Sequence, residues 1–318
     1  MVSLNKEALK VVQEAIDKAD EIKARVESVA GATIIDMGVK AEGGFEAGVL
    51  LSKICMGGLG EVLIGCFECG ELRIPAVIVY TDYPIEACMA SQYAGWKIKV
   101  GDYFAMGSGP ARALARKPKS LYEEIGYSEE TSEAVIALET DKLPTEDAVK
   151  YMAEKCNVKP SDLYIAVAPT NSVAGSVQVS ARIVETGIHK LHALGFDIRR
   201  IKYGWGRAPI APVHPDPLVM MGRTNDMLLY AGETFYIVEY KDEDELAKYI
   251  EEAPSCKSKD YGRSLAEKVA EVGPEFLYKL DPKVFAPAVF AVNNSRTGNT
   301  IVRGKVNLEV LKRSLSIK

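Results

Sequence analysis

The chain of 318 residues has no long apolar run and no excess of basic residues. A membrane-spanning helix needs about 18 or more apolar residues, whereas the longest apolar segments here are short, for example PAVIVY. The first thirty positions read as a charged amphipathic helix. We therefore expect neither a membrane span nor a signal peptide. A formal net charge of -5 argues against nucleic acid, which is bound by clustered Lys and Arg. The expected partner is a small molecule.

Residues that bind metals are few and poorly spaced. Only Cys66 and Cys69, in CFEC, have ligand spacing, and His189, His192 and His214 supply no matching pattern. A strand or strand end with unreactive thiols explains CFEC more simply than a metal or redox pair. The six cysteines lie among apolar neighbours, which suits a reducing cytoplasm better than a disulfide framework. We expect a cytoplasmic protein with no metal.

The pattern of apolar residues predicts a mixed α/β fold. The hydrophobic fraction of 47% is ordinary for a globular chain, and the length is sufficient for two cores. The opening helix is predicted to end near Gly31. Short β-branched runs with Gly or Pro between them predict strands, and these are ATIIDMGV, GEVLIGCFE, IPAVIVYTD and DLYIAVAPT. Further along, DMLLYAGETFYIVEY is predicted to form a hairpin turning at 231–233, and FAPAVFAVNNSRTGNTIVRGKV to form another strand pair.

Two α/β domains follow from this reading, with hairpins as well as crossovers. The segment 127–159 is polar and acidic and contains Pro144, which places the predicted boundary between 1–145 and 146–318. The strand pair at 285–306 could return to the first domain.

The stretch VQVSARIVETGIHKL predicts one helix over 177–191 with an unusual polar stripe. Gln178, Arg182, Glu185 and His189 recur at helical spacing, and apolar residues flank them on both sides. A solvated salt bridge is one interpretation, because Arg and Glu three apart are common on helix surfaces. The wall of a ligand cleft is the other.

The cleft interpretation carries a chemical prediction. The preceding APTNSVAGS contains small residues that allow close approach, and Asn171 and Gln178 would add neutral hydrogen bonds to a polar substrate. Arg182 would favour the ionised form of Glu185, so that the pair could act as a tuned general base.

A second candidate site is MGSGPARAL. Ser108 and Gly109 fit a helix cap, Pro110 fits the first helical position and Arg112 lies in the first turn, a combination that can bind a phosphate. The Lys-Ser/Thr pair of a Walker motif is absent. An ordinary helix cap has the same composition, so both interpretations stay open.

Several long segments match a known family. They are YTDYPIEACMASQYAGWKI, AMGSGPARAL, APTNSVAGSVQVSARIVETGIHKLHALGFD, GWGRAPIAP and GRTNDMLLYAG. Through them the chain resembles the archaeal methenyltetrahydromethanopterin cyclohydrolases from end to end. The resemblance implies a homotrimer of subunits with two α/β domains and a pocket between them, and a reaction in one-carbon metabolism and methanogenesis that uses no metal or redox cofactor.

The resemblance also implies roles for particular residues. Arg182 and Glu185 of ARIVETG would carry catalysis on methenyl-tetrahydromethanopterin, with Glu185 taking a proton from the attacking water and Arg182 orienting Glu185. The methenyl carbon is part of a delocalised cation, so it needs no metal to become electrophilic. Tyr93 and Lys97 would lie near the pterin.

The GSGPAR segment, with Ser108, Gly109 and Arg112, would bind a phosphate of the long substrate tail. Two alternatives remain open. The substrate could be a related pterin that carries one-carbon units, or the protein could be a non-catalytic pterin-binding carrier in which Arg182 and Glu185 are a structural pair.

Overall fold

The structure, a computed structural model, describes residues 2–273 and 282–317. The chain forms two compact units, and it crosses between them more than once. The first unit contains Met1–Glu61 and Ile85–Gln178, and the second contains Val62–Pro84 and Val179–Lys318. The single boundary expected near residue 145 coincides with none of the three junctions, which lie after Glu61, Pro84 and Gln178. The pocket expected between the domains remains a prediction.

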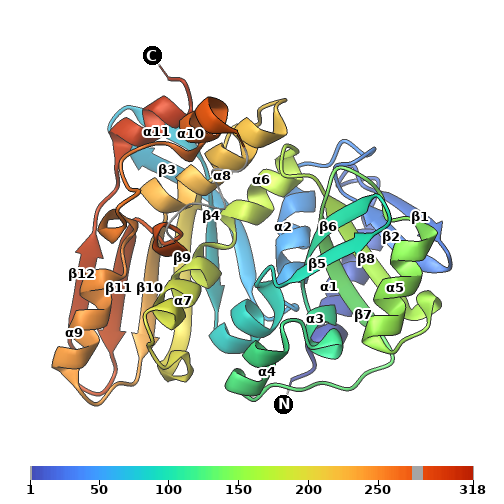
Figure 1. Cartoon of the computed structure of the whole chain (residues 1–318), viewed down its shortest axis with the longest axis horizontal. Coiled ribbons are helices and arrows are strands. Elements are labelled where there is room, and N and C mark those ends of the chain that lie inside the picture. The colour runs from blue at the N-terminus through green and yellow to red at the C-terminus, as the bar shows by residue number, and fades with distance from the viewer. Residues whose placement is uncertain (1, 274–281, 318) are drawn as a thin grey trace. The chain divides into compact units, whose positions relative to one another are not determined.

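The first unit is built on a six-stranded mixed sheet, in the order β1-β2-β8-β7-β6-β5 (Figure 1). Its strands are β1 (Arg25–Val29), β2 (Ala32–Asp36), β5 (Trp96–Val100), β6 (Tyr103–Ser108), β7 (Ala134–Glu139) and β8 (Leu163–Ala168). Strands β2, β8 and β7 are parallel, while β1 and the pair β6 and β5 join antiparallel. Parallel neighbours need a crossover, and the segment near residue 145 is part of the crossover from β7 to β8 rather than a domain junction.

The helical segments of the first unit are α1 (Leu4–Asp17), α2 (Phe45–Cys55), the π-helix η1 (Ile85–Gln92), α3 (Ala111–Ala115), α4 (Lys119–Ile125), α5 (Glu146–Cys156), the short η2 (Pro160–Asp162) and α6 (Val173–Ser180). Helix α5 begins directly after Thr145, because the Thr145 side chain accepts a hydrogen bond from the Ala148 N–H. Helix α6 starts in this unit and its last two residues belong to the second.

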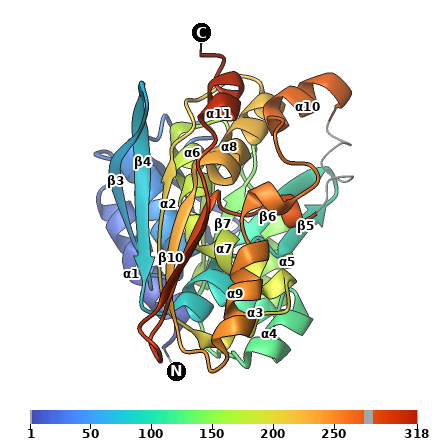
Figure 2. The same cartoon turned by 90° about the vertical axis from the view of Figure 1, so that its left-hand side faces the viewer.

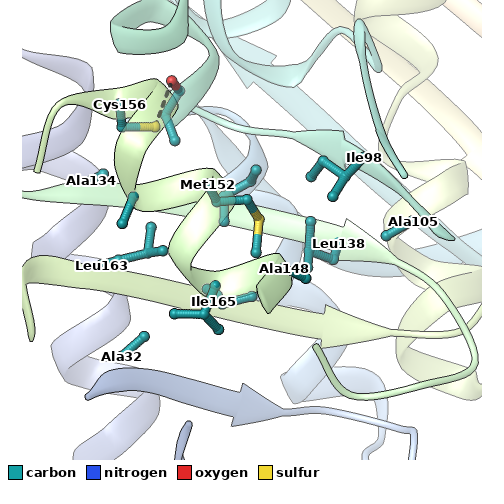
Figure 3. Close-up of a cluster of buried hydrophobic side chains, with 14 of the residues drawn as sticks. Ala32, Ile98, Ala105, Ala134, Leu138, Ala148, Met152, Cys156, Leu163 and Ile165 are labelled. Carbon is teal, nitrogen blue, oxygen red and sulfur yellow. Dashed lines mark hydrogen bonds between the residues drawn. The ribbon is translucent and has the colours of Figure 1, made fainter. Parts of the chain in front are cut away.

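Apolar side chains cover both faces of the first sheet. On one face, Met152 and Ala148 of α5 pack with Ile165, Leu138 and Ile98 of the strands (Figure 3). On the other face, apolar residues of α1 and α2 pack with the alternate residues of β7 and β8. This burial on both faces is typical of parallel strands covered by helices.

The second unit is also built on a six-stranded mixed sheet, in the order β12-β11-β10-β9-β4-β3. Its strands are β3 (Glu61–Cys69), β4 (Leu72–Thr81), β9 (Ile201–Pro209), β10 (Glu233–Val238), β11 (Val289–Asn294) and β12 (Thr300–Gly304). Strands β10 and β11 pair in parallel. Antiparallel pairs join β9 to β4, β9 to β10 and β11 to β12. The strand pair expected at 285–306 therefore belongs to this sheet and does not return to the first unit.

The helical segments of the second unit are α7 (Ile183–Ala193), η3 (Ile198–Arg200), α8 (Pro217–Ala231), α9 (Glu243–Glu252), η4 (Ser255–Lys257), α10 (Leu265–Val272), η6 (Pro282–Val284) and α11 (Leu308–Ser314). Helices α7 and α8 contact β9, and α9 contacts β11 and β12. Helices α10 and α11 pack against α8 (Figure 2). No helix in the described ranges is long and apolar enough to span a membrane.

The mixed α/β class predicted from the sequence is confirmed, but three predicted elements are wrong. The opening helix ends at Asp17, and a hairpin of β1 and β2 follows, with Ala30 and Gly31 at its turn, both at positive φ. The hairpin expected around 231–233 is instead the end of α8 followed by β10, because residues 217–231 bury their apolar side chains as a helix. The third is the helix expected over 177–191.

Asp226 of α8 joins this helix to α10 and α11. Its Oδ1 accepts a hydrogen bond from the Leu265 N–H at the start of α10 (2.8 Å), and its Oδ2 accepts one from the Ser314 hydroxyl at the end of α11 (2.7 Å). The side chain is 0% exposed. Burial raises the pKa of this carboxyl to about 6, since the charged form is disfavoured away from water.

We expect Asp226 to make stability depend on pH. Its pKa in the folded state lies above the ordinary value of about 3.9, so folding binds a proton. The resulting stabilisation is complete below about pH 4 and is lost as pH rises through about 6, a change of about 3 kcal/mol. Asp226→Asn should lack this pH dependence of stability. We therefore expect the difference in free energy of unfolding, wild type minus variant, to fall between pH 4 and pH 7 when it is measured by urea titration. Parallel pH curves would contradict this, and the exposed Asp20→Asn is the charge-matched control.

Candidate active site

The predicted helix over 177–191 is two helices. Helix α6 ends at Ser180 and α7 begins at Ile183, with Arg182 at the N-cap position and its N–H donating to Val179 O at 3.1 Å. The break lies in the second unit, shortly after the chain enters that unit at Val179. Gln178 therefore lies on α6, Arg182 at the break, and Glu185 and His189 on α7, so the four polar residues do not share one continuous helix face.

Arg182 and Glu185 form a largely buried ion pair. Arg182 Nη2 lies 3.0 Å from Glu185 Oε2, and the two side chains are 14% and 7% exposed. The prediction of a solvated surface salt bridge is therefore wrong for this pair. Glu185 lies in the first turn of α7, where the free N–H groups and the helix dipole favour a negative charge. Its other oxygen, Oε1, makes no hydrogen bond with any residue in the described ranges.

Close backbone packing holds α7 against the second sheet. A Cβ atom at Gly204 would lie 2.8 Å from Val184, and one at Gly206 would lie 2.9 Å from Ile183, so β9 requires glycine at both positions. The Tyr236 hydroxyl of β10 donates to Val184 O at 2.8 Å. The first turn of α7, which carries Glu185, is thus fixed by contacts on two strands.

Glycines in α6 and α2 allow close approach of the chain around α6. A Cβ atom at Gly175 would lie 2.0 Å from Pro169 O, and one at Gly48 on α2 would lie 2.5 Å from Val177. The Ser172 hydroxyl accepts from the Gly175 N–H. The ligand approach expected at APTNSVAGS is therefore not needed to explain these residues.

The proposed substrate-binding residues of the first unit lie on different elements. Asn171 is half-buried in the turn before α6, and Gln178 is buried with its Nε2 3.4 Å from Cys55 Sγ. Lys97 is exposed on β5. Tyr93 follows η1, and its ring stacks under Arg112, whose guanidinium carbon lies 5.1 Å from the ring centroid.

The comparisons with known proteins agree on one family. The family described as Cyclohydrolase (MCH) matches residues 3–315. The chain is 48% identical to the methenyltetrahydromethanopterin cyclohydrolase of Methanococcoides burtonii, over 100% of this chain and 99% of the relative. It is 47% identical to the enzyme of that name from Methanocaldococcus jannaschii, over 99% and 98%, and 45% identical to that from Methanothermobacter thermautotrophicus, over 100% of both.

The chain belongs to this cyclohydrolase family. The resemblance inferred from the sequence is confirmed, and the matches cover both units.

The MGSGPAR segment has a structural task in this family member. The Ser108 hydroxyl donates to Gln92 O (2.9 Å), the Gly109 N–H donates to Ser91 O (2.8 Å), and Arg112 donates to Met89 O, Ser91 O and Lys117 O at 2.9 to 3.3 Å. The carbonyls at 89–92 end the π-helix η1, where no further helical N–H follows to satisfy them. These three residues thus cap a helix C-terminus.

This geometry limits what the segment can offer to a phosphate. Arg112 is 0% exposed and Ser108 is 5% exposed, and the following helix, α3, has only five residues. Phosphate binding by Ser108, Gly109 and Arg112 stays a prediction. The Ser108 hydroxyl, the Gly109 N–H, and Nε and Nη1 of Arg112 already donate to carbonyls of the first unit. The sequence signal that separates the two tasks is the MASQ end of η1, which needs donors from elsewhere in the chain.

We expect Arg112→Lys to destabilise the protein without a specific effect on substrate affinity. An ammonium group cannot reach three carbonyls in a fixed fork, so buried acceptors lose their partners, at a cost of about 2–4 kcal/mol. Urea unfolding measures this cost, and the exposed Arg116→Lys should stay within about 0.5 kcal/mol of wild type. Unchanged stability with a raised, salt-dependent KM would show instead that Arg112 binds a phosphate.

Proposed function

We propose that this protein hydrolyses the methenyl bridge of 5,10-methenyltetrahydromethanopterin to N5-formyl-tetrahydromethanopterin, reversibly, in archaeal one-carbon metabolism and methanogenesis. The observation that carries the proposal is the buried ion pair between Arg182 and Glu185 in a chain of the cyclohydrolase family. Relatives that match this chain over nearly their full length are named for this activity. A metal or redox cofactor is not part of the proposed reaction.

Glu185 acts as the base and then as the acid. Water attacks the methenyl carbon while Glu185 Oε1 takes one of its protons, and a neutral carbinolamine forms. The carbon–nitrogen bond at the second ring nitrogen then breaks, and that nitrogen receives the proton back from Glu185. The hydroxyl group of the carbinolamine loses its proton to water as it becomes the formyl carbonyl on N5. Hydrolysis of the cation therefore consumes one water and releases one proton, and no electrons are exchanged.

Arg182 positions the base and balances its charge. Its hydrogen bond to Oε2 holds the carboxylate and leaves Oε1 as the oxygen that can meet water. A lone arginine would repel the methenyl cation, but the Arg182–Glu185 pair is neutral overall. The pair therefore tolerates the cation and stabilises the proton transfer in a poorly hydrated site. Tyr93, Lys97, Asn171 and Gln178 of the first unit are proposed to bind the substrate.

The decay of the methenyl chromophore tests this assignment. In Glu185→Gln we expect kcat to fall by about 10²–10⁴ because the base is lost, with KM changed by only a few-fold because shape and hydrogen bonding are kept. Glu239→Gln is the control, since Glu239 pairs with Arg296 at 3.1 Å on an exposed part of the second unit and should leave turnover unchanged.

The other outcomes decide between the alternatives. Binding of the pterin by wild type without any turnover would identify a carrier. Turnover of a related one-carbon pterin in preference to this substrate would change the substrate assignment. Full activity in Glu185→Gln would reduce the ion pair to a structural role.

A homotrimer in the cytoplasm is the further part of this proposal. Two observations support it. The six cysteines are all free thiols, as suits a reducing compartment. On the second sheet, Gly204 and Gly206 face α7, so the alternate residues of β9 lie on the opposite face. That opposite face exposes large apolar side chains, including Tyr203 (50%), Val302 (54%) and Tyr80 (43%). Such a face fits a second copy of the chain.

We expect light scattering to give the mass of three chains. Replacing Tyr203 and Val302 together by Lys should lower that mass, because ammonium groups would be buried without partners at the contact. Phe45→Lys, at an equally exposed apolar residue of the first unit (45%), should leave the mass unchanged. A wild-type mass of one chain would contradict the trimer.

A further inference from the structure

Strand β5 lies at one edge of the first sheet, next to β6 (Figure 1). Together the two strands have one buried face and one open face. Trp96 and Ile98 on β5 and Ala105 on β6 are buried in the core beneath α5. Side chains alternate along a strand, so Lys97 and Lys99 lie on the other face with Phe104 and Met106. Both lysines are exposed, and Phe104 is 53% exposed. Phe104 therefore presents a large aromatic ring on the same open face as the two cations.

The strand register places these four side chains in a compact block. Lys97 lies directly across from Met106, and Lys99 lies directly across from Phe104. Side chains that face each other in this way are about 5 Å apart at Cβ, and the two lysines are about 7 Å apart along the strand. The block thus combines two ammonium groups with a planar ring and a thioether.

One carboxylate, that of Glu139, lies next to this block, and neither lysine forms an ion pair with it. Neither Lys97 nor Lys99 makes an ion pair with a residue that the structure describes. Glu139, across from Met106 on β7, is the next carboxylate in the row, and the Thr170 hydroxyl donates to it. Arg112, the other cation expected to bind an anion, is buried and donates to backbone carbonyls.

We infer that the open face of β5 and β6 binds the acidic tail of the substrate. Lys97 and Lys99 contact its anionic group as point charges, and Phe104 and Met106 contact its apolar parts. The inference rests on the proposed function and specifies which residues hold the part of the substrate that does not react. Binding of the anionic group, the role first expected of Ser108, Gly109 and Arg112, is thereby assigned to a surface with exposed ammonium groups.

The test separates the tail from the reacting centre. The tail is the same in the methenyl and formyl compounds, so contacts to it stabilise substrate, transition state and product equally, and their loss raises KM without lowering kcat. In the double variant Lys97→Gln with Lys99→Gln we expect KM to rise about tenfold for the methenyl compound and equally for the formyl compound in the reverse reaction, with kcat unchanged. The wild-type KM should rise with salt, and that of the variant should depend on salt much less.

Two further variants make the comparison specific. Phe104→Ser should raise KM by a few-fold in a way that salt does not change. Lys119→Gln with Lys150→Gln removes the same charge from exposed positions on α4 and α5 and should leave KM within twofold of wild type. Circular dichroism and unfolding curves must match wild type for each variant.

Three results would overturn the inference. They are an unchanged KM in the Lys97 and Lys99 double variant, an equal rise of KM in the Lys119 and Lys150 variant, and a loss of kcat at constant KM. In each of these cases the wild type still turns over, so the proposed function survives. Absence of turnover in the wild type would remove the proposed function and this inference with it.

Discussion

The ion pair between Arg182 and Glu185 is the interaction on which the chemistry of this protein depends. Two charges withdrawn from water are stable only when they are paired, and the pair lies 3.0 Å apart with both side chains mostly buried. Its geometry requires that α7 begin at one particular residue. That start is fixed by the close approach of α7 to β9, which only glycine at 204 and 206 permits. Backbone packing in the second sheet therefore determines where a carboxylate oxygen is presented to water.

The same constraint, that a buried polar group needs a partner, explains features of the first unit that resemble binding sites. The four backbone N–H groups that follow β2 donate to the buried carboxylate of Asp36. The MGSGPAR segment supplies donors to the end of η1. A segment rich in hydrogen-bond donors can bind an anion, and it can equally cap the free carbonyls at the end of a helix. Both tasks require N–H and guanidinium donors. Burial decides between the two, and burial is a property of the tertiary structure.

The two units contribute different kinds of residue. The second carries the buried pair proposed for proton transfer, and the first carries an exposed block of two lysines, a phenylalanine and a methionine. Proton transfer needs few, well-oriented groups with little water around them, whereas binding an acidic tail needs exposed cations that a charged ligand can reach.

The sequence by itself determined the mixed α/β class, most strands and the family. The class and the strands follow from the local alternation of apolar residues. The family follows from long specific segments, such as the one that contains ARIVETG. Both signals are local in the sequence and do not depend on contacts with distant segments. It also identified Arg182 and Glu185 as neighbours, since three residues along a helix bring side chains together. Only the tertiary structure decided that the stripe from Gln178 to His189 is broken, that Arg112 is buried, and that β3 and β4 leave the first unit to join the second. Each of these depends on contacts between segments far apart in the chain, and no local pattern in the sequence encodes which of two equally apolar surfaces a segment will meet.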